Sequence, residues 1–267
     1  MDHIAHTDAD CPSSRIGAVP GPEPLRSLPG APAIASLLAL LVPSRCAVCD
    51  EPRKETGGGG VCPACWAALP RLAPGAACPL CALPGDGSPC PACRREPPPV
   101  SRTLAYGLYA GGLKSLLHAF KFRGWDLLAA PSGARLAAAA GDAGLDDDVD
   151  ALVPVPSTRG RNRSRGYDPA ALLAESAARR LGLPARALLV RTRETAPQSE
   201  QPAARRRANV DGAFAASASA RGRVLVLVDD VATTGATLFS AARALARAGA
   251  ADVRGLVLAR TPEPEPS

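Results

Sequence analysis

The sequence is poor in aromatic residues and has no long hydrophobic run. Only 3% of its 267 residues are aromatic, which disfavours a platform that stacks many nucleic-acid bases. The longest largely apolar run, Ile34 to Val42, is far shorter than the roughly 20 residues that cross a bilayer. The first ten residues are acidic and lack the basic and apolar regions of a secretory signal. We therefore expect a cytoplasmic protein without a membrane span.

Lysine is nearly absent, with 3 lysines against 28 arginines, and the formal net charge of +6 is unevenly distributed. Residues 1–150 carry 13 basic and 15 acidic side chains, whereas residues 151–260 carry 18 and 8. The second part of the chain therefore has a net charge of +10. An anion-binding site is expected there, because a local excess of positive charge attracts anionic ligands.

Cysteine is abundant and regularly spaced. Eight of the nine cysteines form four C-x-x-C pairs, separated by 12, 12 and 8 residues. One such pair offers two thiolates to one ion, and two pairs complete the closed tetrahedral site that is typical of structural zinc. An iron–sulfur cluster is a weaker alternative because the spacing differs from that of ferredoxins, and a redox dithiol explains one pair but not four. Sequential pairing gives one Zn²⁺ site of Cys46, Cys49, Cys62 and Cys65 and another of Cys78, Cys81, Cys90 and Cys93, with interleaved pairing as the alternative.

The composition and the hydrophobic pattern of the chain change near residue 101. The cysteine-bearing segment before it is small and rich in Pro and Gly, so it needs bound metal to fold. After it, strand-like and helix-like stretches alternate, which indicates a parallel α/β sheet. The expected divisions are a disordered tail at 1–33, a double zinc ribbon with a short leading helix at 34–96, an α/β domain at 101–262 and a polar tail at 263–267.

Individual elements can be predicted within the α/β part. The continuous apolar stretch 224–228 is typical of a strand that is buried on both faces. Asp168 and Pro169 form a helix-start signal, and Gly182 marks the end of that helix. The predicted strands are 103–109, 151–156, 224–228 and 253–258, and the predicted helices are 113–122, 127–140, 168–181 and 237–248.

The most informative stretch is VLVLVDDVATTGATL, residues 224–238. Its apolar strand ends at Asp229 and Asp230, and a short loop then opens a helix. Backbone N–H groups at a helix start, a glycine that permits close approach and threonine hydroxyls together make a phosphate cradle. Adjacent carboxylates repel each other unless a cation or hydroxyl groups compensate them. A phosphate cradle beside two carboxylates therefore favours a phosphorylated sugar over bare phosphate.

This stretch resembles the 5-phosphoribosyl 1-diphosphate (PRPP) motif of type I phosphoribosyltransferases. The resemblance implies that Asp229 and Asp230 hold the ribose hydroxyls, directly or with Mg²⁺, and form the catalytic pair. It also implies a PRPP-binding role for the residues that follow, around the 5-phosphate. These residues are Val231, Ala232, Thr233, Thr234, Gly235, Ala236 and Thr237.

The order of motifs over roughly residues 40–262 resembles the ComF competence family. Cysteine knuckles are followed by YAGGLKSLLHAFKFRG, then VPVPSTRGRNRSRGYDPA, then Gln198, Arg206 and Asn209, and then the PRPP motif. One departure is RGYDPA, where the family usually reads RGFNQA. The resemblance implies a double zinc ribbon joined to a phosphoribosyltransferase domain, with a role in DNA uptake.

Several basic residues are further candidates for binding the diphosphate. Arg159 and Arg165 lie in an arginine-rich segment after the 151–156 strand, and the planar guanidinium suits oxyanions. By resemblance this segment is the loop on the pyrophosphate side, and Lys121 faces the diphosphate. Arg205–Arg207 fall in the segment that resembles a flexible active-site loop. The same arginines could also contact single-stranded DNA.

Two functions follow from these residues. The first is an enzyme that transfers phosphoribosyl from PRPP to an acceptor with Mg²⁺, although the sequence contains no evident general base. The second is a competence factor that senses PRPP or handles single-stranded DNA, with competence-machinery proteins as partners and without turnover. The acceptor and the oligomeric state are not readable from the sequence.

Overall fold

The computed structural model describes residues 45–53, 60–192 and 212–262. The predicted tails at 1–33 and 263–267, and the leading helix near residues 34–42, lie outside these ranges. The segment with Gln198 and Arg205 to Asn209 also lies outside them. No helix within the described ranges has both the length and the apolar character needed to cross a membrane.

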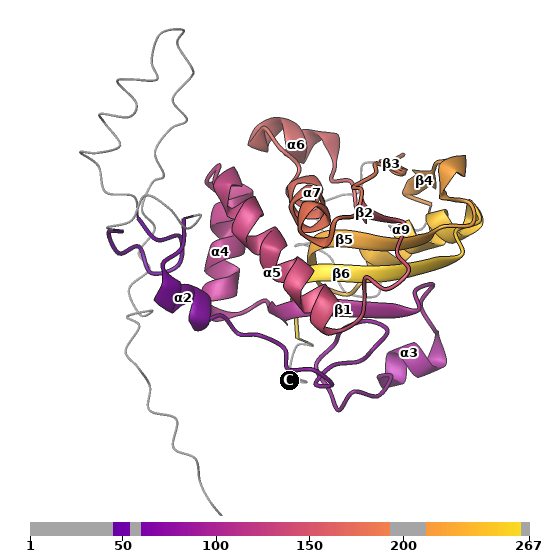
Figure 1. The fold of residues 1–267 in the computed structure, drawn as a ribbon, viewed down its shortest axis with the longest axis horizontal. Coiled ribbons are helices and arrows are strands. Elements are labelled where there is room, and N and C mark those ends of the chain that lie inside the picture. Colours follow the sequence, from indigo (N-terminus) through magenta and orange to yellow (C-terminus); the bar gives the residue numbers. More distant parts are fainter. Residues whose placement is uncertain (1–44, 54–59, 193–211, 263–267) are drawn as a thin grey trace, which may run out of the picture.

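A four-stranded sheet forms the centre of the molecule (Figure 1). Its strands are all parallel and have the order β1-β6-β5-β2. The prediction of a parallel α/β sheet is therefore confirmed, and the carboxyl ends of all four strands meet at one edge. The strands are β1 (Arg102–Leu108), β2 (Ala151–Pro154), β5 (Val224–Ala232) and β6 (Asp252–Arg260).

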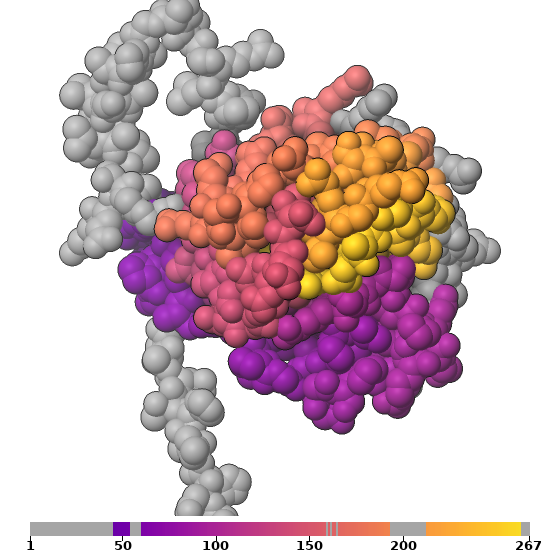
Figure 2. All heavy atoms as spheres, turned by 45° about the vertical axis from the view of Figure 1, so that its right-hand side comes forward, coloured from indigo at the N-terminus to yellow at the C-terminus, as the bar shows by residue number. Residues whose placement is uncertain are grey.

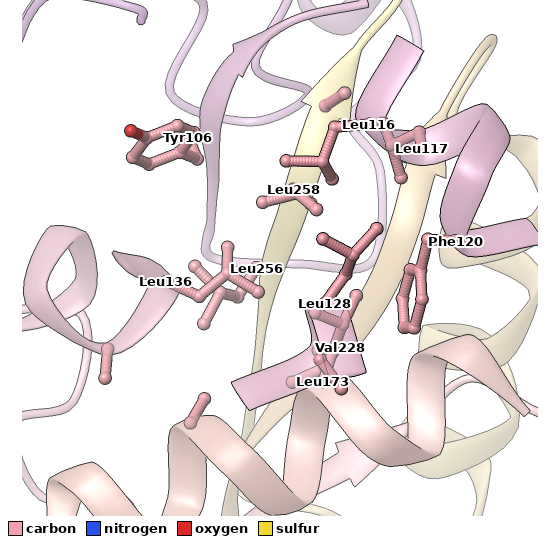
Figure 3. Packing of buried hydrophobic residues seen from close by; sticks show 14 of the residues in the cluster. Tyr106, Leu116, Leu117, Phe120, Leu128, Leu136, Leu173, Val228, Leu256 and Leu258 are labelled. Atoms are coloured by element: carbon pink, nitrogen blue, oxygen red, sulfur yellow. The ribbon is translucent and has the colours of Figure 1, made fainter. Parts of the chain in front are cut away.

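Helices cover both faces of this sheet. Successive side chains of a strand point to opposite faces, so alternate residues of β5 pack against different helices. Val226 and Val228 of β5 pack in one cluster with α4 (Gly111–Phe122), α5 (Ala129–Asp142) and α7 (Pro169–Leu181). Figure 3 shows part of this cluster, with Phe120, Leu136 and Leu173 converging on Val228 and Leu256.

Leu225 and Leu227 of β5 pack in a second cluster, on the other face, with α9 (Ala236–Arg247). Both of these leucines are completely buried, and each such side chain contributes about 2 kcal/mol of hydrophobic stabilisation. Continuous burial on two faces explains why 224–228 has no polar alternation.

The helix signals in the sequence correspond to real caps. The Asp168 side chain accepts a hydrogen bond from the Ala170 amide at 3.1 Å, with Pro169 as the first helical residue of α7. Gly182 follows the helix with a φ of 68°, in the left-handed region that glycine adopts at low cost. The departure at RGYDPA therefore leaves the helix start intact.

Three details differ from the sequence predictions. Strand β5 continues through both aspartates to Ala232 instead of ending before them. The arginine-rich segment, predicted as a loop, forms helix α6 (Arg159–Arg165). The helix predicted at 127–140 begins as the 3-10 turn η1 (Asp126–Leu128) before α5. The chain also has elements that were not predicted: β3 (Leu189–Arg191) paired antiparallel with β4 (Phe214–Ala216), and the 3-10 turn η3 (Ala218–Ala220).

Tertiary contacts explain the formation of α6, whose sequence has no apolar period. Asp168 accepts hydrogen bonds from the Ser157 amide and the Asn162 side-chain amide, both at 3.0 Å. Gly166 ends the helix with a φ of 81°. The Asp168 carboxylate, which follows the helix in the chain, therefore bonds both to the residue before the N-cap and to a residue of the first turn. No local sequence pattern predicts these contacts.

The cysteine-bearing segment, with α2 (Pro63–Ala67) and α3 (Pro91–Arg95), packs directly on the α/β part. The Leu72 amide donates to the Tyr106 carbonyl at 3.1 Å, and the Leu108 amide donates to the Pro70 carbonyl at 2.9 Å. In Figure 2 this violet segment lies against the magenta and yellow elements without a gap. The segment thus borders β1 along one side of the sheet.

Candidate functional site

A cavity of about 250 Å³ lies at the carboxyl edge of the sheet. Ligands of open α/β sheets bind at this edge. The segments that directly follow β1 and β2, the end of β5 and the start of α9 each contribute residues there. Its lining comprises Tyr109, Lys121, Val155, Pro156, Ser157, Arg165, Arg191, Asp229, Asp230, Val231, Ala232, Thr233, Gly235, Ala236, Thr237 and Leu238.

Two adjacent carboxylates lie in this cavity. Asp230 is 9% exposed, and its Oδ1 pairs with the Lys121 Nζ at 2.7 Å. Burial, together with the neighbouring Asp230 charge, raises the pKa of Asp229 to about 8, although Lys121 acts in the opposite direction. The pair therefore lacks enough positive charge to keep both groups ionised. A cation or the hydroxyl groups of a sugar would supply what is missing.

A tight turn connects β5 to α9. Gly235 has a φ of 78°, and a Cβ placed on it would lie 2.7 Å from the Phe239 ring. Both facts require glycine at this position. The turn brings the first amides of α9 to the cavity, where the helix N-terminus favours an anion. Two carboxylates and a glycine turn in the lining of one cavity suit a ligand with hydroxyls and a phosphate.

Basic side chains border the same cavity. Arg165 comes from the end of α6, and its guanidinium lies 5.1 Å from the centre of the Phe122 ring. Arg191 comes from β3, and its Nη1 donates to the Pro156 carbonyl at 3.4 Å. Arg159, also predicted for this role, is the first residue of α6, and its side chain lies outside the described part of the structure. Lys121, Arg165 and Arg191 thus add positive charge to the lining of the cavity that holds the carboxylates.

Most of the residues suggested by the sequence come together here. Lys121, Arg165 and the aspartates line the cavity with nearly all of residues 231–237. Thr234 is the exception, because its Oγ1 instead accepts a hydrogen bond from the Ala236 amide at 3.3 Å and caps the turn. His118, which the sequence gave no reason to select, is exposed and contacts Phe122.

Three polar lining residues were missed by the sequence reasoning: Tyr109, Ser157 and Arg191. Tyr109 directly follows β1, and Ser157 lies three residues after β2. The rule that ligands bind at the carboxyl ends of strands could have identified both. Arg191 had no such signal, because β3 lies outside the parallel sheet.

The eight paired cysteines form two groups in sequential order, and the interleaved alternative is excluded. The first group is Cys46, Cys49, Cys62 and Cys65, and the second group is Cys78, Cys81, Cys90 and Cys93. Within each group the sulfurs all lie within 4.8 Å of one another. The closest printed sulfur pairs are 4.0 Å in the first group and 3.8 Å in the second. A tetrahedron with Zn–S bonds of about 2.3 Å has edges of about 3.8 Å, so both groups fit such an ion.

Backbone amides donate hydrogen bonds to one sulfur of each group and favour its thiolate form, which is the form that binds metal. Cys46 Sγ accepts from the Cys62 amide at 3.3 Å, and Cys78 Sγ accepts from the Cys90 amide at the same distance. Burial raises the pKa of the Cys46 thiol, but the amides that donate to its sulfur outweigh burial and hold the pKa at about 7. The same balance holds the pKa of Cys78 at about 7. Burial and neighbouring thiols raise the pKa of Cys65 and Cys93, so a cation is needed to deprotonate each full set.

Comparison with known proteins matches both parts of the chain. A phosphoribosyl transferase domain family matches residues 168–266, and a double zinc ribbon domain family matches residues 37–94. "DNA utilization protein YhgH" of Escherichia coli O157:H7 is 35% identical over 83% of this chain and 99% of its own length. "Competence protein F" of Haemophilus influenzae is 30% identical over 64% of this chain and 78% of its own.

"Competence protein ComFC" of Bacillus subtilis is also 30% identical, over 75% of this chain and 84% of its own length. The matches with the Escherichia coli and Bacillus subtilis relatives extend over most of this chain. The two family matches agree with the order of motifs in this chain and with its two cysteine groups. The chain therefore belongs to the ComF family, in which a double zinc ribbon precedes a phosphoribosyltransferase domain.

Proposed function

We propose that the cavity at the carboxyl edge binds PRPP with Mg²⁺ and that the chain transfers or cleaves its phosphoribosyl group. The observation that carries this proposal is the juxtaposition of Asp229 and Asp230 with the Gly235 turn in one cavity. The turn and the first amides of α9 would hold the 5-phosphate. The two carboxylates would hold the ribose hydroxyls or Mg²⁺, whose preferred ligands are such hard oxygens.

The proposed chemistry depends on stabilisation of the leaving group. Transfer breaks the bond between C1 of the ribose and the pyrophosphate oxygen and forms a bond from C1 to the acceptor. Negative charge grows on the departing pyrophosphate, and fixed positive charge stabilises it. Lys121 and Arg165 line the cavity and would supply this charge on the protein side, and Mg²⁺, when bound, would add Lewis-acid stabilisation of that leaving group. Burial and the neighbouring Asp230 charge raise the pKa of Asp229, so a bound cation would stabilise its ionised form.

Calorimetry of the intact chain with PRPP, with and without Mg²⁺, tests the binding. We expect saturable binding that Mg²⁺ strengthens. Pyrophosphate release with a panel of acceptors then tests turnover. Release that requires one acceptor supports transfer, and release without any acceptor supports cleavage. Absence of PRPP binding under both metal conditions would refute the proposal.

A second candidate function is PRPP sensing without turnover. It is favoured by two observations: no histidine lines the described cavity, and Asp230 is already paired with Lys121. A PRPP-bound chain that releases no pyrophosphate with any acceptor would support it.

We also propose that each cysteine group holds one structural Zn²⁺. Four thiolates fill a tetrahedral site and leave no position for a reacting water. Keeping eight thiols available for metal requires a reducing compartment, which favours the cytoplasm. A role in DNA uptake or utilisation, with single-stranded DNA or competence proteins as partners, is proposed from the names of the relatives.

A further inference from the structure

A buried arginine lies between the second cysteine group and the turn that follows β5. Arg260, the last residue of β6, is 5% exposed. Its Nε donates to the Cys81 carbonyl at 2.9 Å, and its Nη1 donates to the Ala232 carbonyl at 3.1 Å. Cys81 belongs to the second cysteine group, and Ala232 immediately precedes the Thr233–Gly235 turn. The Arg260 guanidinium thus connects the second cysteine group to the residue that precedes the turn.

Arg260 has no carboxylate partner within the described residues. Its hydrogen bonds go to backbone carbonyls, including that of Thr261 at 3.0 Å. A buried guanidinium is costly unless a negative charge lies near it. Four thiolates around one Zn²⁺ carry a net negative charge. The second cysteine group, when it holds metal, therefore supplies the charge that Arg260 lacks.

Two other contacts strengthen this connection. Thr103 of β1 is buried, its amide donates to the Pro79 carbonyl at 2.7 Å, and its hydroxyl donates to the Leu80 carbonyl at 2.8 Å. Phe239 of α9 packs against the second cysteine group, and its ring limits the space at Gly235. The sheet therefore donates hydrogen bonds to three successive carbonyls of the Cys78–Cys81 turn, those of Pro79, Leu80 and Cys81. Helix α9 contacts the same cysteine group through the Phe239 ring.

The first cysteine group is attached elsewhere. A Cβ on Gly112, near the start of α4, would lie 3.0 Å from Val48 of that group's first knuckle. Lys121 is at the other end of α4, nine residues or about 13 Å further along the helix. The first group thus offers a natural control for the second.

We propose that Arg260 is a positioning residue that couples metal in the second cysteine group to the phosphate-binding turn. This inference rests on the proposed function, which assigns the turn to the 5-phosphate. Without metal, the Cys78–Cys81 turn loosens and Arg260 loses both an acceptor and its compensating charge. The Ala232 carbonyl then loses its anchor, and the turn no longer presents a fixed set of amides. Metal in the second group thereby sets the phosphate affinity of the site.

The experiment compares Cys90→Ser with Cys62→Ser in the full-length chain. Zinc content and calorimetric affinity for ribose 5-phosphate without Mg²⁺ are measured for both. Each variant should lose one zinc ion. Cys90→Ser should weaken ribose 5-phosphate binding about tenfold or more, as expected when a hydrogen bond to a charged group is lost, and Cys62→Ser should leave it nearly unchanged. Equal losses in the two variants would overturn the coupling.

Arg260→Gln tests the same connection with both cysteine groups intact, so it remains informative if Cys90→Ser fails to fold. It should keep two zinc ions and still weaken ribose 5-phosphate binding about tenfold. Arg254→Gln, in the same strand but bonded to Asp252 and the Leu145 carbonyl, is the matched control and should keep wild-type affinity. Wild-type affinity in Arg260→Gln would overturn the proposal.

A wild-type chain that binds no ribose 5-phosphate or PRPP would refute the proposed function, and the coupling is then tested without ligand. Hydrogen exchange of the amides at 233–237 should be faster in Cys90→Ser and Arg260→Gln than in the wild type and in Cys62→Ser. Unchanged exchange in both variants would refute the coupling as well.

Discussion

Lys121 Nζ lies 2.7 Å from Asp230 Oδ1, and both side chains are largely buried, with 19% and 12% exposure. The pair joins the end of α4 to β5 across the candidate site. It satisfies one of two adjacent carboxylates, while Asp229 forms no ion pair with any residue in the described part of the chain. This arrangement links the stability of the fold to the charge that a ligand brings.

Replacement of Lys121 tests this link between fold stability and charge in the site. Lys121→Met removes the ion pair of Asp230 beside a second carboxylate, so we expect a loss of about 2 kcal/mol in the free energy of unfolding. Lys114→Met, at an exposed position of the same helix, is the control and should be neutral. Chemical denaturation without added Mg²⁺ measures both. A neutral Lys121→Met would mean that the pair contributes nothing to the fold.

The pH dependence of stability follows from Asp229. Because the pKa of Asp229 is raised to about 8 in the fold from about 3.9 in an unfolded chain, the folded state retains a proton that the unfolded state releases. The contribution of this group to stability is therefore lost as the pH rises from about 4 to 8. Asp229→Asn should be more stable than the wild type, by a margin that grows over this range and is constant above it.

Denaturation of the wild type and Asp229→Asn at several pH values between 5 and 9 measures this margin. Titration of the cysteines is common to both proteins and cancels in the difference. Asp142→Asn, at an exposed position of α5, serves as the control. A margin independent of pH would show that Asp229 is ionised in the fold.

The turn glycine offers a steric test. Gly235→Val combines a left-handed φ with a collision against Phe239, so it should abolish ribose 5-phosphate binding. Gly222 has a φ of 70° with open space around it, so Gly222→Val should carry only the backbone strain of about 1–2 kcal/mol. Calorimetry and thermal unfolding of the two variants separate strain from loss of the cradle. Intact phosphate binding in Gly235→Val would argue against the cradle.

Metal content tests the cysteine groups. The purified chain should contain about two zinc ions per molecule, since each group offers four thiolates to one tetrahedral ion. Chelation should unfold the cysteine-bearing segment, because metal binding supplies its folding energy. Elemental analysis and circular dichroism measure both effects. Iron in place of zinc, or a segment that stays folded without metal, would disprove this assignment.

Local patterns predicted the parts of the molecule that local physics determines. Strand 224–228 was predictable because burial on both faces demands an unbroken apolar run, and α7 because Asp168 and Gly182 cap it by their own chemistry. The C-x-x-C spacing likewise predicted two sites of four sulfurs. Parallel order then brought separate motifs to one edge of the sheet.

Features that depend on distant contacts were not predictable. Helix α6 forms because Asp168 bonds back to Ser157 and Asn162, and its sequence alone reads as a loop. The Lys121–Asp230 pair joins residues more than a hundred positions apart. Arg260 gave no signal, because its partners are backbone carbonyls whose positions only the folded chain determines.

The most direct measurement is calorimetric titration of PRPP with Mg²⁺ into the wild type and into the double variant Asp229→Asn, Asp230→Asn. The variant keeps the shape of both side chains and removes their charges. The account predicts that the wild type binds PRPP, that the double variant loses this Mg²⁺-assisted binding and that it stays folded with both zinc ions. Equal PRPP affinity in the two proteins, or no binding by the wild type, would contradict the assignment of this cavity to PRPP.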